Sequence, residues 1–137
     1  MNLTENFTLE ELTYSATASL KGNANMPGLR EIDNLKRLCQ EVLQPIRDAY
    51  GKPLRVTSAF RSVTLNKAVR GAETSQHLIG EAADIVCDNN LSLWNLICKM
   101  ILEGKISVGQ LIDEKNLKWI HVSLPSSNHL NQIICIK

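Results

Sequence analysis

The sequence has few aromatic residues, no block of like charges and no long hydrophobic run, and each absence removes a class of function. Aromatic residues make up 4% of the chain and the formal net charge is +1, so a nucleic-acid-binding surface is not expected. No apolar run reaches the roughly 20 residues of a transmembrane helix, so membrane insertion is not expected. The opening stretch MNLTENFTLEELTYS lacks the basic and apolar regions of a signal peptide, which favours synthesis as a soluble cytoplasmic protein.

The cysteines also lack the paired spacing of a thiolate metal site. None of the four belongs to a C-x-x-C pair, and each lies among apolar residues: Cys39, Cys87, Cys98 and Cys135. Zinc bound by thiolates is therefore not expected. The sequence predicts buried free thiols instead.

Length and patterning indicate one domain over residues 1–137, large enough to bury a core, without repeats or low-complexity segments. Thr8 opens a short helix as part of a capping box. Residues 15–28, with two glycines and a proline, are typical of a loop. Apolar residues then recur at helical spacing over about 29–50, where Pro45 predicts a kink or an early end and Gly51 a stop.

The second half of the chain carries most of the expected strands. A helix is expected over 62–70, ended by Gly71, and an almost wholly apolar, buried helix over 91–102. Strands are expected over 53–58, 81–87, 109–113 and 118–124, while 132–136 fits either a strand or a helical turn. Helices come first and strands mostly later, so the predicted fold class is α+β, a single domain with an antiparallel β-sheet packed with helices.

Three residues stand out as candidates for metal binding. Strand alternation places Asp84 on one face with Ala82 and Val86, and a carboxylate in so apolar a run is seldom buried unless it is paired or bound to metal. His77 precedes it in a polar segment, and His121 lies downstream in KWIHVSL. Two histidines and one carboxylate suit zinc with one coordination position left open.

Each candidate also has an ordinary structural interpretation. His77 could be a hydrogen-bonding loop residue, Asp84 could pair with an arginine, and His121 could be a satisfied core histidine. Arg61 lies between an expected strand and an expected helix. In a zinc hydrolase it could bind a substrate carboxylate or stabilise an oxyanion, and otherwise it would be exposed or ion-paired. His129, in a polar loop, is assigned to the surface.

With these residues in view, the sequence resembles the zinc D-Ala-D-Ala carboxypeptidase family, peptidoglycan peptidases that share the fold of hedgehog domains. The family pattern S-x-x-R, then S-x-H-x-x-G-x-A-x-D, then W-x-H occurs as Ser58–Arg61, Ser75–Asp84 and Trp119–His121. Further likeness to the small phage and prophage, endolysin-like members lies in Phe7–Ala18, Leu43–Arg47, Leu65–Asn66 and Gln110–Ile112.

The resemblance implies a zinc metallopeptidase that cleaves peptide bonds of peptidoglycan stem peptides, as a D-Ala-D-Ala carboxypeptidase or an endolysin-type endopeptidase. It implies that His77, Asp84 and His121 bind Zn²⁺. It also implies that Arg61 binds the substrate and stabilises the oxyanion, with Ser75 and Gln76 lining the cleft. The protein would act on the cell wall once exported or released.

The sequence departs from the family at the general base. Better-known members have an acidic residue three positions before the second histidine, where this chain has Lys118. Glu114 is the nearest substitute and Asp113 the second choice, although both could be solvated turn residues. A missing base also fits an alternative function, a catalytically weak or inactive zinc-containing module that binds the cell wall or serves in a phage structure. A metal-free scaffold with core histidines is a third possibility.

Overall fold

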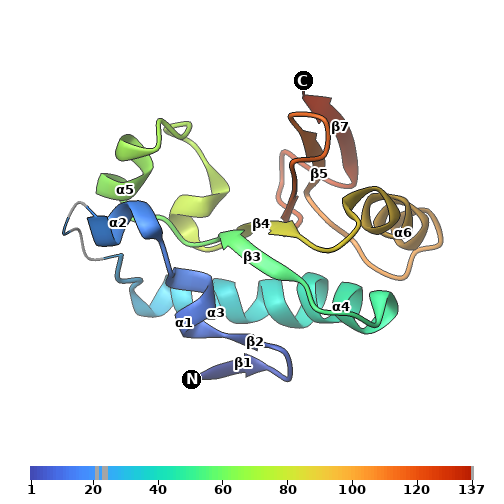
Figure 1. The fold of residues 1–137 in the computed structure, drawn as a ribbon, viewed down its shortest axis with the longest axis horizontal. Helices are drawn as coiled ribbons and strands as arrows, with labels where there is room; N and C mark the ends of the chain where they lie inside the picture. Colours follow the sequence, from blue (N-terminus) through green and yellow to red (C-terminus); the bar gives the residue numbers. More distant parts are fainter. Residues whose placement is uncertain (21, 23–24, 137) are drawn as a thin grey trace.

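The computed structural model describes residues 1–20, 22 and 25–136, and its centre is a five-stranded sheet with the strand order β3-β4-β6-β5-β7. The strands are β3 (Arg55–Ser58), β4 (Ala82–Val86), β6 (Trp119–Ser123), β5 (Gln110–Glu114) and β7 (Gln132–Ile136). Figure 1 shows this sheet beside the helices that cover it. The predicted α+β class is confirmed, with each strand near its expected position.

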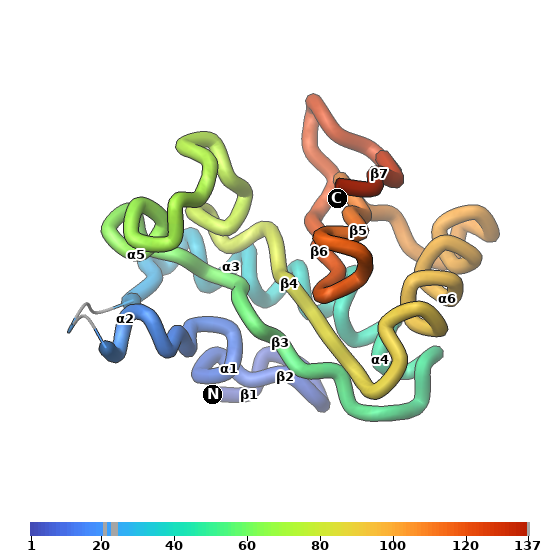
Figure 2. Tube along the Cα trace, turned by 45° about the horizontal axis from the view of Figure 1, so that its top comes forward, coloured from blue at the N-terminus to red at the C-terminus, as the bar shows by residue number. Residues whose placement is uncertain are grey.

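The sheet is mixed, so the prediction of an antiparallel sheet is wrong for its last strand. The first four strands pair antiparallel, whereas β7 runs parallel to β5. At the end of β6, the Ser123 carbonyl accepts a hydrogen bond from Gly109 N–H at 2.8 Å, so the end of β6 lies beside the start of β5. After β6 the chain continues beyond this end of the sheet and returns to it at Asn131, whose N–H donates a hydrogen bond to the Val108 carbonyl at 2.6 Å. β7 starts there and pairs parallel with β5, next to which it lies in Figure 2.

The described part of the N-terminal segment contains three elements that the sequence did not predict. β1 (Asn2–Thr4) and β2 (Phe7–Thr8) form an antiparallel pair. α1 (Leu9–Thr13) follows, and the Thr8 hydroxyl accepts a hydrogen bond from Glu11 N–H at 3.1 Å, as the capping box predicted. A short helix, α2 (Ala16–Leu20), occupies part of the segment expected to be a loop. The rest of that loop prediction includes residues 21, 23 and 24, which lie outside the described residues.

The long helix predicted over 29–50 consists of α3 (Leu29–Leu38), a π-helical turn over Cys39–Leu43 and α4 (Gln44–Tyr50). Figure 1 shows α3 and α4 as one continuous rod. Pro45 does not end the helix early. Proline has no N–H to donate and its ring crowds the preceding turn, and the wider π turn before it accommodates both. The helix ends at Gly51, whose φ of 76° is left-handed, as predicted.

The core lies between this helix, α6 (Asn90–Leu102) and one face of the sheet. Ile120 and Val122 on that face are fully buried. α6 buries only one side, because Leu91 and Leu102 are exposed at 58% and 81%, so the expectation of a helix buried almost all round is corrected. Among the described residues, no helix has the length and apolar character to cross a membrane.

The cysteine prediction holds in part. All four thiols are free, and Cys39 is fully buried. Cys87 and Cys98 are half-buried, and Cys135 is exposed. Cys135 differs from the expectation because β7 is the edge strand of the sheet and no further element covers it among the described residues.

Candidate metal centre

His77 lies on a 3₁₀ turn, η2 (Gln76–Ile79), that is fixed at both ends. The Ser75 hydroxyl caps the turn by accepting a hydrogen bond from His77 N–H at 3.2 Å. Gly80 ends it with a φ of 78°, and a Cβ at this position would lie 2.6 Å from the Glu31 carbonyl oxygen of α3. The site therefore needs a glycine both for its left-handed backbone and for the close approach of the helix.

The ring of His77 is 2% exposed and is oriented by the backbone of the segment that follows β3. Its Nδ1 lies 2.6 Å from the Ala59 carbonyl oxygen, and the Arg61 N–H donates back to the His77 carbonyl at 3.0 Å. A carbonyl oxygen only accepts, so Nδ1 carries a proton, and Nε2 is the ring nitrogen that faces Asp84. This is the arrangement that commonly orients a metal-binding histidine.

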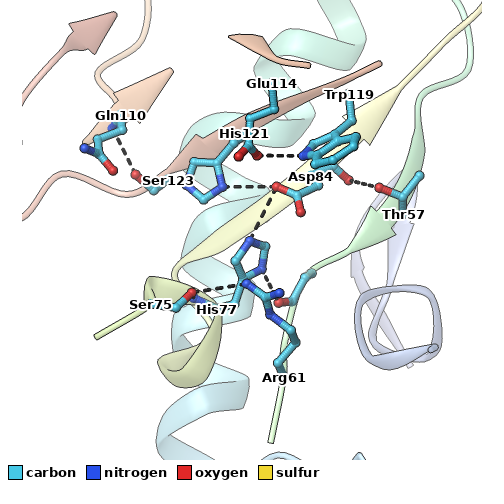
Figure 3. A network of polar contacts seen from close by, with 11 residues as sticks. Thr57, Arg61, Ser75, His77, Asp84, Gln110, Glu114, Trp119, His121 and Ser123 are labelled. Carbon is cyan, nitrogen blue, oxygen red and sulfur yellow. Dashed lines mark hydrogen bonds and ion pairs between the residues drawn. The ribbon is translucent and has the colours of Figure 1, made fainter. Parts of the chain in front are cut away.

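Asp84 and His121 are direct partners on neighbouring antiparallel strands, which brings their side chains together on one face. His121 Nδ1 lies 3.0 Å from Asp84 Oδ1, and His77 Nε2 lies 3.4 Å from the same oxygen, as drawn in Figure 3. Burial raises the pKa of the Asp84 carboxyl, but the hydrogen bonds to His121 and His77 outweigh it and bring the pKa well below its usual value. The carboxylate is therefore ionised.

The three predicted ligands converge. One donor atom from each of His77, Asp84 and His121 lies within 4.8 Å of the others. The two histidines, rather than an arginine, are the ionic partners of the Asp84 side chain among the described residues. Two imidazoles with lone pairs to offer and one carboxylate form a donor set that fits a catalytic zinc ion with three protein ligands. The three residues could thus hold a divalent metal.

The cluster lies in a cleft of about 880 Å³ whose lining includes Arg61, Ser75 and Gln76. Arg61 Nη2 donates to the Ser75 hydroxyl at 3.2 Å, and its buried Nε has no hydrogen-bond partner among the described residues. Burial lowers the pKa of the Arg61 guanidinium, while Asp84 and Glu114 act in the opposite direction. An arginine remains charged under such a shift. Gln76 donates to the Leu124 carbonyl at 3.3 Å, so its amide also ties η2 to the end of β6.

The two candidate bases point to opposite faces of β5. Glu114 lines the cleft, where its Oε2 accepts a hydrogen bond from Trp119 Nε1 at 2.6 Å. Asp113 is not part of the lining, and its Oδ1 accepts from Leu117 N–H at 2.6 Å in the turn between β5 and β6. Lys118, where the family resemblance led us to expect an acid, is exposed and also outside the lining.

Sequence reasoning missed the cleft wall formed by the C-terminal segment. His129, assigned to the surface, is half-buried and lines the cleft together with Ser126, Asn128 and Gln110. Its Nδ1 lies 2.9 Å from Gln132 Oε1. The polar sequence around His129 carries no signal for this position. His129 reaches the cleft because the segment between β6 and β7 passes the start of β5.

A mixed sheet packed with helices, with a histidine–aspartate–histidine cluster beside an arginine and a glutamate in one cleft, defines a metal-dependent hydrolase. The chain belongs to the Peptidase M15 family, whose model matches residues 5–123. It is also similar to the zinc D-Ala-D-Ala carboxypeptidase of Streptomyces albus G, with 52% identity over 44 residues, which is 31% of this chain and 17% of that protein. The family resemblance expected from the sequence is confirmed.

Proposed function

We propose that this protein is a zinc-dependent peptidase that hydrolyses a peptide bond in the stem peptides of peptidoglycan. The observation that carries the proposal is the convergence of His77, Asp84 and His121 within 4.8 Å, in a cleft that also contains Arg61 and Glu114. Membership of the Peptidase M15 family supports peptide hydrolysis. The stem-peptide substrate is supported by the zinc D-Ala-D-Ala carboxypeptidase relative, of which this chain matches a small part.

In this proposal His77 Nε2, Asp84 Oδ1 and His121 Nδ1 are the metal ligands. The chemistry supplied by a bound zinc ion is polarisation of a carbonyl group and activation of water near neutral pH. The protein contributes a fixed geometry. The Ala59 carbonyl sets the ring of His77, and the pairing of β4 with β6 sets Asp84 against His121. Ligands fixed in this way need little rearrangement when the metal binds.

Glu114 is the proposed general base. Trp119 Nε1 holds Oε2 of the carboxylate at 2.6 Å, which leaves Oε1 to accept a proton from the attacking water and to pass it to the leaving amine. The glutamate shares the cleft face of the sheet with His121, since Ile112 pairs with His121 and Glu114 pairs with Trp119. Glu114 thereby replaces the acid that relatives carry where this chain has Lys118.

Arg61 is the proposed binding group for negative charge. Its guanidinium donates one hydrogen bond, to Ser75, and retains further N–H groups, including the buried Nε. Those donors suit either a peptide carboxylate or the oxyanion that develops during hydrolysis. Because Ser75 caps η2 as well, Arg61 and His77 are positioned by the same hydroxyl.

The decisive experiment measures zinc content and peptide cleavage together. Zinc-loaded protein is incubated with purified cross-linked peptidoglycan, and new amino termini are counted and located by mass spectrometry. His77→Ala and Asp84→Asn should lose zinc and activity. Glu114→Gln should keep zinc and lose activity by about 10²–10⁴-fold, the usual contribution of a general base. Glu103→Gln, an exposed acid paired with Lys105 at 3.4 Å, is the matched control and should change neither.

A second candidate function is favoured by Lys118, which leaves the usual base position without an acid. In that case the domain would bind the cell wall, or serve as a phage structural module, without turnover. The same experiment separates the two, because a binding module would hold peptidoglycan and zinc without producing new amino termini. An endolysin role in phage release, with the enzyme reaching the wall after synthesis in the cytoplasm, is the version of the peptidase proposal supported by the likeness to small family members.

A further inference from the structure

The cleft continues beyond the metal cluster to β5 and the loop before β7. Arg61 follows β3 at one edge, the cluster lies on β4 and β6, and β5 and β7 complete the other side. The strand pairing aligns Asp84, His121, Ile112 and Ile134 in one row across four strands, all on the face that carries the cluster. An extended ligand laid along this row would pass from Arg61 over the cluster to the β7 side.

The wall on the β7 side is lined by Ser126, Asn128 and His129 of the loop before β7, together with Gln110 of β5. These C-terminal residues lie outside the part of the chain that matches the family model, which ends at residue 123. His129 and Gln110 line the cleft. Figure 3 shows Gln110 on the side of the cluster opposite Arg61. The wall is therefore a feature of this chain that the family pattern does not assign.

Hydrogen bonds hold this wall in place. Gln132 Oε1 accepts from Gln110 Nε2 at 3.2 Å and lies 2.9 Å from His129 Nδ1. Ser126 and His129 exchange backbone hydrogen bonds of 2.9 and 3.3 Å. At the base of the loop the Asn131 side chain accepts from Val108 N–H at 2.8 Å. A binding wall fixed in advance loses little conformational entropy when a ligand binds.

The wall presents both kinds of hydrogen-bonding group to a ligand. Because the Gln132 oxygen accepts, Nδ1 of a neutral His129 carries the proton and Nε2 is left as an acceptor. Gln110 retains its amide oxygen as an acceptor and the second hydrogen of Nε2 as a donor, because Nε2 gives one hydrogen to Gln132. A peptide group carries one N–H donor and one C=O acceptor. This set of groups is complementary to a peptide backbone.

We propose that His129 and Gln110 form a subsite that binds a backbone peptide group of the substrate, with Gln132 as the positioning residue that holds both. This proposal rests on the proposed peptidase function and specifies its substrate as an extended peptide. Neighbouring strands are about 4.8 Å apart, so β7 lies roughly 10 Å from β6. An extended peptide advances about 3.3 Å per residue. The subsite therefore binds a peptide group two or three residues from the peptide bond that is cleaved at the cluster, on the side away from Arg61.

The test compares two synthetic stem-type peptides that share the cleaved bond and the residues on the Arg61 side. The short peptide has one residue on the other side of the bond, and the long peptide has four. Wild-type protein should show a kcat/KM at least about tenfold higher for the long peptide, the gain expected from one or two hydrogen bonds. His129→Ala and Gln132→Ala should remove most of this preference through KM, with kcat and the short peptide unaffected.

Two further variants distinguish the loss of the subsite from a general disturbance of the loop structure. Gln132→Glu keeps an acceptor for His129 and Gln110 and should retain more of the preference than Gln132→Ala. Ser127→Ala changes an exposed residue of the same loop outside the cleft lining and should behave as wild type. Equal losses for both peptides, or an unchanged preference in His129→Ala and Gln132→Ala, would overturn the subsite.

The subsite is separable from the proposed function by binding measurements. If zinc-loaded wild-type protein cleaves neither peptide, the peptidase proposal fails, and calorimetry with the same long peptide still decides the subsite. Tighter binding by wild type than by Gln132→Ala, about five- to tenfold, would support it. Equal affinity for both proteins, or no binding to wild type, would refute it.

Discussion

Asp113 is predicted to stabilise the turn that carries Glu114 and to take no part in the chemistry. In that turn Lys115, Asn116 and Leu117 have positive φ values of 53°, 59° and 62°. A left-handed conformation costs roughly 1–2 kcal/mol for each residue other than glycine, so the turn stores about 3–6 kcal/mol. The Asp113 carboxylate offsets part of this cost by accepting a hydrogen bond from Leu117 N–H at 2.6 Å.

Asp113→Ala removes a hydrogen bond to a charged group, which contributes about 1.5–3 kcal/mol. The free energy of unfolding should fall by about 2 kcal/mol, measured by urea denaturation of protein from which metal has been stripped by a chelator. Asn116→Gly should raise it by about 0.5–1 kcal/mol, because glycine adopts the left-handed conformation without strain and residue 116 is exposed. Asn116→Val, with a β-branched side chain at the same position, should lower it.

Measurements of peptidase activity then distinguish the role of Asp113 from that of Glu114. Asp113→Asn should retain wild-type peptidase activity at a temperature where it is folded, since its side chain lies outside the cleft lining. Glu114→Gln should not. Unchanged stability of Asp113→Ala, together with loss of activity and retained zinc in Asp113→Asn, would make Asp113 the base and refute the assignment of Glu114.

Three further predictions concern the site and the thiols. His121→Ala should bind substoichiometric zinc in elemental analysis while keeping its fold by circular dichroism, and full zinc occupancy would argue against the ligand assignment. Gly80→Ala should lower the free energy of unfolding by about 2–4 kcal/mol in a denaturant titration, because its Cβ would lie 2.6 Å from the Glu31 carbonyl oxygen in a left-handed backbone; a neutral result would contradict this packing. Cys135 should react first with a thiol reagent, whereas burial raises the pKa of the Cys39 thiol to about 12 and should delay its labelling until unfolding; the reverse order would refute this.

The sequence was sufficient to predict the cluster because local patterning determines its geometry. Strand alternation assigned Asp84 and His121 each to one face of its own strand. The antiparallel pairing of β4 with β6 makes the two residues direct neighbours. The 3₁₀ turn that presents His77 was not predicted, although its serine cap and its terminal glycine are present in the sequence. Glu114 was preferred over Asp113 as the nearest substitute. The register of β5 against β6 places Glu114 on the face of the sheet that carries His121.

The sequence was insufficient where long-range pairing decides. Residues 132–136 fit two kinds of secondary structure, and only the free edge of β5 makes them a parallel strand. That pairing moves His129 from a polar surface loop into the cleft wall, which no local pattern around it could indicate. Similarly, the π turn before Pro45 depends on the burial of Val42, Leu43 and Ile46 in the core, which keeps the helix continuous across the proline.

If the proposed subsite is correct, the elements that hold the cluster are separate from those that select the substrate. The cluster is built from β4, β6 and a turn tied to the backbone at Ala59, so its geometry depends on elements inside the matched family region. The wall that carries His129 lies in the loop between β6 and β7, after that region, and β7 pairs with β5. Changes in the loop before β7 can therefore alter which peptide reaches the cluster without disturbing the donor atoms themselves. Selection for substrate length would act on this loop, while the positions of His77, Asp84 and His121 are constrained by the core.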